Sequence, residues 1–180
     1  MTTSPVAHVA GPRLRLRLIT PEDAPYVHAL RVNPLYNRHL SAVTGTAEDQ
    51  RQWIERYKVQ EARCQQLYYV IERHDGMRCG VVRLYDIKDT QFTWGSWILD
   101  ANKPPKAALE SAVLSFGIGF DHLGLQVAKV DVRVENTHAE AFYRRLGMIE
   151  THRTAQDIFF DYPRELFEET RSTYLQLLKG

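Results

Sequence analysis

Two lysines stand in a short turn that leads into an apolar helix, in the segment Lys103-Pro104-Pro105-Lys106-Ala107-Ala108. The first backbone N–H groups of a helix have no partner inside the helix, and the helix macrodipole places roughly half a positive charge there. Positive side chains at such an end strengthen its attraction for anions. The turn therefore predicts an anion site, although a solvated basic turn would have the same composition.

A second junction follows about thirty residues later, where a strand over residues 127–134 leads into a short helix that begins near Asn136 and carries Tyr143. We expect the ligand of the basic turn to be shared between the two junctions. The strand before the turn, residues 91–99, contains Trp94 and Trp97, which a regular strand places on opposite faces.

The rest of the chain supplies elements that can hold these junctions. Leucine alternates with arginine from Arg13 to Leu18, which predicts a strand with one buried face. Thr20 followed by Pro21 predicts a helix start, Asn33-Pro34 predicts its end, and Thr46 caps a second helix. Further strands are expected over 67–72, 79–86, 149–153 and 157–162, with a hairpin turn at residues 75–76 and a last helix from 164.

Composition indicates a single globular domain over residues 12–180, preceded by a flexible lead-in over 1–11. Apolar residues make up 44% of the 180 residues and charged residues 25%, which disfavours disordered and membrane classes. The net charge of +1 gives no overall attraction for nucleic acid or an anionic membrane. Any positive potential is therefore expected to be local.

The two cysteines, Cys64 and Cys79, have neither a paired spacing nor a nearby histidine at metal-ligand distance, so we expect buried thiols and no metal site. The N-terminus lacks the pattern of a signal peptide, and no apolar stretch reaches 18 residues. A cytoplasmic location is the expectation that follows.

The order of these elements resembles the GCN5-related N-acetyltransferase (GNAT) family, and two motifs make the resemblance specific. The acyl-CoA loop of that family reads Gln/Arg-x-x-Gly-x-Gly/Ala and begins five positions after an aliphatic strand residue. Here Ile98 is the aliphatic residue, Lys103 stands at the Gln/Arg position and Ala108 at the Gly/Ala position. Lys106 replaces the glycine that lets the backbone approach a diphosphate closely. A lysine fits there if its φ is negative and its side chain points away, or if its ammonium group joins the phosphates.

The second motif of the family reads Asn-x-x-Ala-x-x-aromatic/aliphatic-Tyr-x-x-Leu-Gly-Phe. At these positions the chain has Asn136, Ala139, Phe142, Tyr143, Leu146, Gly147 and Met148. The apolar members would equally suit the core face of a short amphipathic helix. The resemblance implies an α+β fold with a mixed, mostly antiparallel sheet of six to seven strands, splayed between its fourth and fifth strands, with flanking helices and an extra C-terminal helix.

For chemistry, the resemblance implies that acetyl-CoA donates its acetyl group to a primary amine that attacks the thioester directly. Strands 91–99 and 127–134 would be parallel and separate at their C-terminal ends, so that pantetheine pairs with their backbone like an added strand. A backbone N–H near Ile98 is the candidate oxyanion donor, and the phenol of Tyr143 can protonate the departing thiolate. The residues expected to bind acetyl-CoA are Trp97, Ile98, Leu99, Lys103, Pro104, Pro105, Lys106, Ala107, Ala108, Asn136, Phe142 and Tyr143.

Ser96 is the second catalytic candidate, because it lies two residues before Ile98 and would order the acceptor amine or a relay water. A small residue packed under pantetheine is the alternative. Spacing and residue type identify no general base, and water can serve in its place. Asp131 lies in the middle of an apolar strand, where we expect it to pair with Arg133 on the same face.

The acceptor is less well defined by the sequence. Residues 25–150 resemble the branch that acetylates nucleotide-linked amino sugars of surface glycans, whereas length and layout also resemble the ribosomal-protein N-terminal acetyltransferase branch. A non-catalytic acyl-CoA-binding module is an alternative of another class. On the sugar interpretation the expected acceptor contacts are Arg31, Asn33, Arg38 and Tyr85, since a diphosphate binds arginine forks and a base needs a flat surface. The expected partner is a small-molecule amine, with no nucleic acid or membrane, and the expected state is a monomer or a homodimer.

Overall fold

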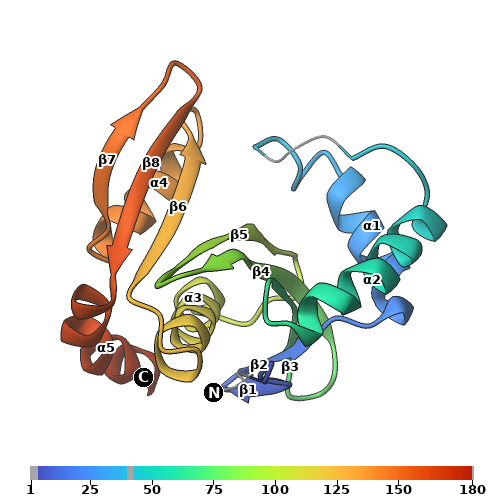
Figure 1. Cartoon of the computed structure of the whole chain (residues 1–180), viewed down its shortest axis with the longest axis horizontal. Helices are drawn as coiled ribbons and strands as arrows, with labels where there is room; N and C mark the ends of the chain where they lie inside the picture. The colour runs from blue at the N-terminus through green and yellow to red at the C-terminus, as the bar shows by residue number, and fades with distance from the viewer. Residues whose placement is uncertain (1–3, 40–42, 180) are drawn as a thin grey trace.

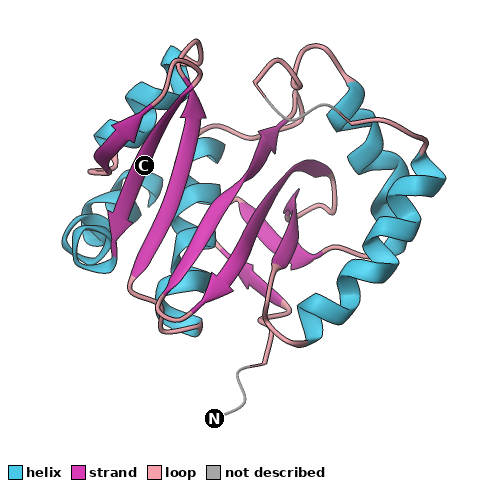
Figure 2. Ribbon diagram, turned by 45° about the horizontal axis from the view of Figure 1, so that its top comes forward, coloured by secondary structure: helices cyan, strands magenta, loops and turns pink. Residues whose placement is uncertain are grey.

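The computed structural model describes residues 4–39 and 43–179, which form one eight-stranded sheet flanked by helices (Figures 1 and 2). Its strands are β1 (His8–Ala10), β2 (Leu14–Leu18), β3 (Leu67–Arg73), β4 (Arg78–Lys88), β5 (Gln91–Leu99), β6 (Val127–Arg133), β7 (Ile149–Arg153) and β8 (Asp157–Pro163). Their order across the sheet is β1-β2-β3-β4-β5-β6-β8-β7, and only the β5–β6 pair of this sheet is parallel. The predicted mixed, mostly antiparallel α+β fold is confirmed.

Helices cover both faces of the sheet (Figure 2). They are η1 (Pro21–Asp23), α1 (Ala24–Val32), α2 (Ala47–Ala62), α3 (Ala107–Gly117), the π-helix η2 (Ile118–His122), α4 (Thr137–Arg145) and α5 (Arg164–Lys179). On one face, Val27 of α1 and Ile54 of α2 pack in a cluster with Tyr68, Val81 and Ile98 of the strands. The larger core lies on the other face, between the sheet and the helices that follow β5.

The helix boundaries follow local sequence signals. The Thr46 hydroxyl accepts the N–H of Asp49 at 3.2 Å, and the Asp49 carboxylate accepts the N–H of Thr46 at 2.8 Å, which is a complete capping box at the start of α2. Helix α1 ends at Val32, and its C-cap Asn33 is extended because Pro34 follows. These short-range signals confirm the predicted starts and ends.

The lead-in was expected to be irregular, and this is wrong for β1. Val9 pairs with Leu16 of β2, and the carbonyl oxygen of Val6 accepts the Tyr69 hydroxyl at 2.8 Å. A three-residue strand is too short for alternation to be read from the sequence. This strand also raises the count from the predicted six or seven strands to eight.

The sheet opens between β5 and β6, at the predicted place. Three residue pairs join the two strands, from Gln91↔Val127 to Thr93↔Lys129. Beyond them β6 continues with β8, while β5 continues with β4, so the strands diverge toward their C-terminal ends (Figure 1). The sheet therefore has two free inner edges that face each other.

A β-bulge at Ser96 changes which face of β5 is buried. Val81 pairs with Ile98 and Arg83 with Gly95, so one extra residue of β5 is inserted, and Ser96 has a φ of +49°. Trp94 and Trp97 consequently lie on the same face, with ring centroids 5.1 Å apart. The expectation that they lie on opposite faces is wrong because alternation restarts after the bulge.

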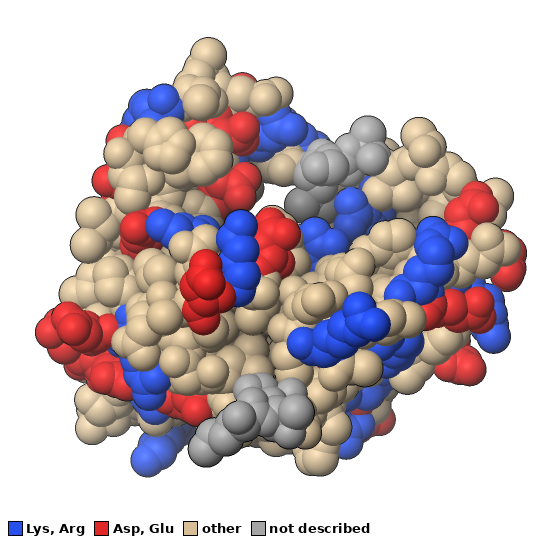
Figure 3. All heavy atoms as spheres, viewed as in Figure 1, with Lys and Arg blue, Asp and Glu red and all other residues tan. Residues whose placement is uncertain are grey.

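Helix α5 closes the C-terminal side of the molecule. Phe167 packs against Phe120 at 5.1 Å between ring centroids, and the Tyr174 hydroxyl donates to the Leu146 carbonyl oxygen at 2.9 Å. Within residues 4–39 and 43–179, no helix is long and apolar enough to cross a membrane. Acidic and basic side chains are interspersed over the face in Figure 3.

Candidate active site

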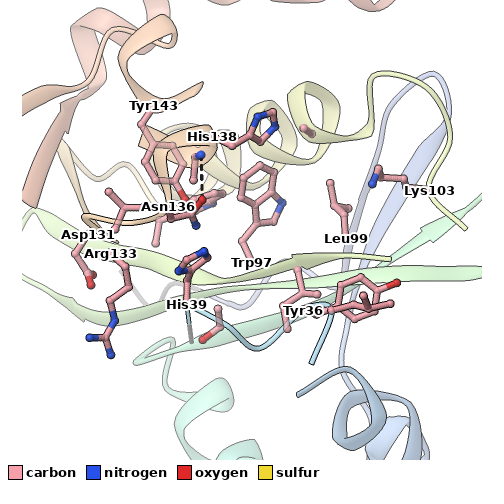
Figure 4. Close-up of a pocket in the computed structure, with 18 residues that line it drawn as sticks. Tyr36, His39, Trp97, Leu99, Lys103, Asp131, Arg133, Asn136, His138 and Tyr143 are labelled. Carbon is pink, nitrogen blue, oxygen red and sulfur yellow. Dashed lines mark hydrogen bonds between the residues drawn. The ribbon is translucent and has the colours of Figure 1, made fainter. Parts of the chain in front are cut away.

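A cavity of about 430 Å³ lies where β5 and β6 separate. Figure 4 shows Tyr143 and His138 on one side of β5, with Tyr36 and His39 on the other, while Asp131 comes from β6. The cavity therefore connects the two faces of the sheet. One side can receive a donor and the other an acceptor.

The free edge of β5 presents backbone groups to this cavity. The Asp100 N–H donates to the Cys79 carbonyl oxygen at 2.8 Å, toward β4. Because successive N–H groups of a strand alternate in direction, the N–H of Ile98 also faces β4, whereas those of Trp97 and Leu99 face the open edge. These two neighbours of Ile98 are the donors available to an extended ligand or an oxyanion.

The loop between β5 and α3 is held by buried contacts. The Asp100 carboxylate, 7% exposed, accepts the Tyr26 hydroxyl at 2.7 Å and the Asn102 N–H at 2.8 Å. The Ala101 N–H donates to the Tyr36 hydroxyl at 3.2 Å. Lys103, which lines the cavity, is therefore carried by a loop whose backbone is fixed at its start.

Lys106 has a left-handed backbone conformation, a region that favours glycine. It is the N-cap of α3 with a φ of +64°, and its Nζ donates to the Leu177 carbonyl oxygen of α5 at 2.6 Å. Neither expected arrangement is found, since φ is positive and the ammonium group is bonded to α5. No side chain caps the first turn of α3. The Ala107 N–H donates to the Pro104 carbonyl oxygen at 3.3 Å, so the N–H groups of Ala108 and Leu109 are the ones left for an anion.

Tyr143 of α4 lines the cavity between β5 and β6. Its side chain is 6% exposed and packs edge-on against Trp94 at 5.8 Å and Phe160 at 6.1 Å. Among the described residues its hydroxyl has no hydrogen-bond partner, although it belongs to the cavity wall. Burial, and then the negative charge of Asp131, raise the pKa of Tyr143, so the phenol stays protonated at neutral pH.

Asn136 and Phe142 are two further residues of the second motif, and both have a structural role. The Asn136 side chain accepts the Ala139 N–H at 3.2 Å and caps α4, the bond marked in Figure 4. Phe142 stacks on Trp97 with centroids 5.5 Å apart. The motif thus fixes the start of α4 and docks it on β5, which positions Tyr143.

Seven of the twelve residues predicted to bind acetyl-CoA line the cavity: Trp97, Ile98, Leu99, Lys103, Ala108, Asn136 and Tyr143. The others, Pro104, Pro105, Lys106, Ala107 and Phe142, lie outside its lining. Ser96 lines the cavity at the bulge, where either of its two expected roles is geometrically open.

Asp131 is a cavity residue that the sequence did not identify. It was expected to pair with Arg133, but Arg133 contacts Asp157 at 3.6 Å instead. Desolvation, and then the charge of Asp157, raise the pKa of the Asp131 carboxyl above its ordinary value. Its alternation with buried Val130 and Val132 was the available signal, because it places Asp131 on the face of β6 opposite the larger core.

Tyr36 and His39 were also missed, since the segment around them has no regular period. They line the cavity from the loop after α1, together with Leu35. Residues 40–42 of the same segment lie outside the described residues.

The four predicted acceptor contacts are not brought together in this cavity. Arg31 lines a separate hollow, Tyr85 lines another, and Arg38 is exposed. The Asn33 side chain accepts the Leu35 N–H at 2.9 Å and so shapes the turn after α1. Tyr85 nevertheless lies next to Gly95, which lines the cavity. A Cβ added to Gly95 would be 3.2 Å from the Tyr85 hydroxyl.

Comparisons with known proteins agree with this geometry. The model of the acetyltransferase (GNAT) domain family matches residues 13–149. The solved structure of apo FdhC, described as a nucleotide-linked sugar GNAT, is 31% identical, with a TM-score of 0.86 over 97% of this chain and 98% of that one. A comparison with curated protein sequences gave no match.

More distant structures share the fold. Spermidine N-acetyltransferase from Vibrio cholerae, in complex with CoA and spermine, is 18% identical, with a TM-score of 0.74 over 88% of this chain and 99% of that one. A putative acetyltransferase from T. thermophilus is 15% identical, with a TM-score of 0.75 over 96% and 97% of the two chains.

The chain therefore belongs to the GNAT family of acetyltransferases. It is an acetyl-CoA-dependent N-acetyltransferase, as the sequence motifs predicted. The cavity between β5 and β6 is where its two substrates can meet.

Proposed function

We propose that the chain acetylates the primary amine of a nucleotide-linked amino sugar, in the biosynthesis of a surface glycan. The observation that carries this proposal is the similarity to FdhC, which extends over nearly the whole of both chains at 31% identity. The two-sided cavity supports it, because an acceptor can approach from the α1–α2 face while the acyl donor lies on the α3–α4 face.

On the acceptor side, we assign Asp131 as the general base. Its raised pKa brings the carboxylate closer to the pKa of a protonated amine, which favours proton transfer. The amine nitrogen forms a bond to the acetyl carbon, and its proton passes to Asp131 directly or through one water. The N–H groups of Trp97 and Leu99 stabilise the negative charge on the carbonyl oxygen.

On the donor side, Tyr143 acts as the general acid. When the carbon–sulfur bond breaks, the leaving thiolate takes the phenolic proton, and solvent then restores it. Burial keeps this phenol protonated until that step. Lys103 and the first turn of α3 would contribute positive potential for the CoA diphosphate.

The test is a thiol-release assay with acetyl-CoA and a panel of amines. The panel contains UDP-linked and TDP-linked amino sugars, spermidine, and peptides with ribosomal-protein N-termini. We expect kcat/KM for one amino sugar nucleotide to exceed that of every other amine by about 100-fold or more. Its 4-hydroxy or 3-hydroxy counterpart, which lacks the amine, is the matched control and should release no thiol. Preference for a peptide or for spermidine would refute the proposal.

A further inference from the structure

A second hollow, of about 470 Å³, lies between α1, α2 and the strands β3 and β4. Three arginines from three different elements line it: Arg31 of α1, Arg56 of α2 and Arg83 of β4. Trp53 and Tyr68 also line it. We call this site the arginine hollow.

The arginines of this hollow outnumber the carboxylates that line it. Among residues 4–39 and 43–179, no ion pair involves Arg31, Arg56 or Arg83. One carboxylate, Asp49, lines the hollow and is held by Thr46 in the capping box of α2. Three guanidinium groups and one carboxylate leave two positive charges, which favour an anion of about that charge.

Two buried polar atoms at this hollow also lack partners. Neither the Tyr68 hydroxyl nor the Arg83 Nε makes a hydrogen bond within the part of the chain that the structure describes, and Tyr68 is 1% exposed. A buried polar group without a partner is costly, so such groups are usually satisfied by a ligand or by water. A ligand rich in acceptor oxygens would satisfy both.

Aromatic side chains hold these groups in position. The Arg83 guanidinium lies 4.1 Å from the centroid of the Tyr85 ring and 5.8 Å from that of Tyr68. Trp53 stacks on Tyr57 at 5.5 Å and meets Tyr68 edge-on at 5.9 Å. The indole is therefore a rigid, flat surface at the wall of an anion site, which suits a nucleobase next to its phosphates.

The arginine hollow adjoins the acceptor side of the catalytic cavity. Arg83 is the cross-strand partner of Gly95, and Gly95 lines that cavity. Adjacent strands are about 5 Å apart, so an anion at Arg83 lies within about two strand spacings of the cavity. The sugar of a nucleotide-linked acceptor would extend from this anion toward the cavity that Asp131 lines.

We propose that the arginine hollow binds the nucleoside diphosphate of the acceptor, with the diphosphate at the three arginines and the base against Trp53. This inference rests on the proposed function and names the site that would recognise the nucleotide. Among the predicted acceptor contacts it retains Arg31. It replaces Asn33, Arg38 and Tyr85 by Arg56, Arg83 and Trp53.

Isothermal titration calorimetry tests this proposal with three probes: UDP, TDP and inorganic pyrophosphate. All titrations contain saturating CoA, so that the CoA cavity is filled. We expect a nucleoside diphosphate to bind, and Arg56→Ala and Arg83→Met each to weaken it by 10-fold or more. Arg63→Ala is the matched control, because Arg63 is an exposed arginine at the end of α2 outside the hollow. Trp53→Phe should weaken UDP or TDP more than pyrophosphate.

Unchanged affinity in both Arg56→Ala and Arg83→Met would overturn the assignment, as would the absence of nucleotide binding to the CoA-saturated protein. If Trp53→Phe weakened the binding of pyrophosphate and of the nucleotide equally, the placement of the base against Trp53 would be wrong. Arg56 is exposed, so its variant keeps the test valid if Arg83→Met unfolds.

The outcome is separable from that of the proposed function. If nucleotide binding depends on the arginines but no amino sugar nucleotide is acetylated, the assignment of the hollow is supported and the proposed acceptor is wrong. If an amino sugar nucleotide is acetylated and both arginine variants leave its KM unchanged, the proposed acceptor is supported and the assignment of the hollow is wrong.

Discussion

The ammonium group of Lys106 donates a hydrogen bond to the carbonyl oxygen of Leu177 at 2.6 Å, which joins the start of α3 to the last turn of α5. The last carbonyl groups of a helix have no partner within it, and a basic side chain there is favourable. Here that side chain comes from the acyl-CoA loop. The C-terminal helix therefore supports the loop that the family motif defines.

The backbone of Lys106 predicts an unusual order of stabilities at this position. A left-handed φ of +64° costs a residue with a Cβ about 1 kcal/mol relative to glycine. Lys106→Gly should thus be more stable than Lys106→Ala by about 1 kcal/mol, although both lose the bond to Leu177. Urea unfolding of the two variants measures the difference. Equal stabilities would mean that the loop relaxes to another conformation.

The two lysines of the loop should respond differently to salt. Lys103 lines the cavity, so Lys103→Ala should raise the KM for acetyl-CoA about 3- to 10-fold at low ionic strength and less at 0.5 M salt, where charges are screened. Lys106 is bonded to α5, so any KM change in Lys106→Ala should vary little with salt. Initial rates at both salt concentrations provide the comparison. A strongly salt-dependent effect at position 106 would place that ammonium group at the phosphates.

Tyr143→Phe tests the general acid. We expect kcat to fall about 10- to 10³-fold with a small change in the KM for acetyl-CoA, because the proton is needed only in the transition state. The ring contacts with Trp94 and Phe160 remain, so thermal unfolding should be nearly unchanged. An unaltered kcat would remove Tyr143 from this role.

Asp131→Asn tests the general base through the pH profile. The carboxylate accepts a proton only when ionised, so its contribution grows as pH rises through its raised pKa. In the variant, kcat should fall about 10- to 100-fold. At acidic pH, the increase of kcat with pH should reflect only deprotonation of the acceptor amine and no longer ionisation of Asp131. Asp161→Asn is the control, since Asp161 pairs with Lys129 outside the cavity lining. Parallel profiles for wild type and Asp131→Asn would indicate that water serves as the base.

Asp23 predicts a pH-dependent part of the folding stability. Its carboxylate, 2% exposed, pairs with Arg17 at 2.8 Å and Arg78 at 3.3 Å. Burial alone would raise the pKa of Asp23, but the bonds to Arg17 and Thr20 lower it overall. Because this pKa is lower in the folded state, the ionised carboxylate stabilises the fold at pH values above the unfolded-state pKa of about 3.9. This contribution to the free energy of unfolding is lost as pH falls through the folded-state pKa. Asp23→Asn should therefore cost on the order of 2 kcal/mol at pH 7.

The measurement is urea unfolding at pH 7 and pH 3.5, where the difference from wild type should shrink at the lower pH. Glu169→Gln is the control, because Glu169 is an exposed residue of α5 that forms no ion pair within the described residues. A constant difference at both pH values would show that packing, rather than charge, is lost.

The sequence by itself determined most of the helices and strands and the second motif, because these depend on contacts a few residues long, but it did not indicate β1. The Asn136 cap is made by the Ala139 N–H three positions away, and the Thr46 capping box closes within α2. The resemblance of the second motif to the GNAT family then placed Tyr143 near the separated strands and implied acetyl transfer from acetyl-CoA.

Only the tertiary structure decided which distant groups meet. Lys106 and Leu177 are 71 positions apart, and Arg31, Arg56 and Arg83 come from two helices and a strand. The bulge at Ser96 turned Trp97 to the face of Trp94, and the divergence of β6 put Asp131 into the cavity. Such placements depend on strand register and helix docking, which are set by the whole core rather than by local spacing.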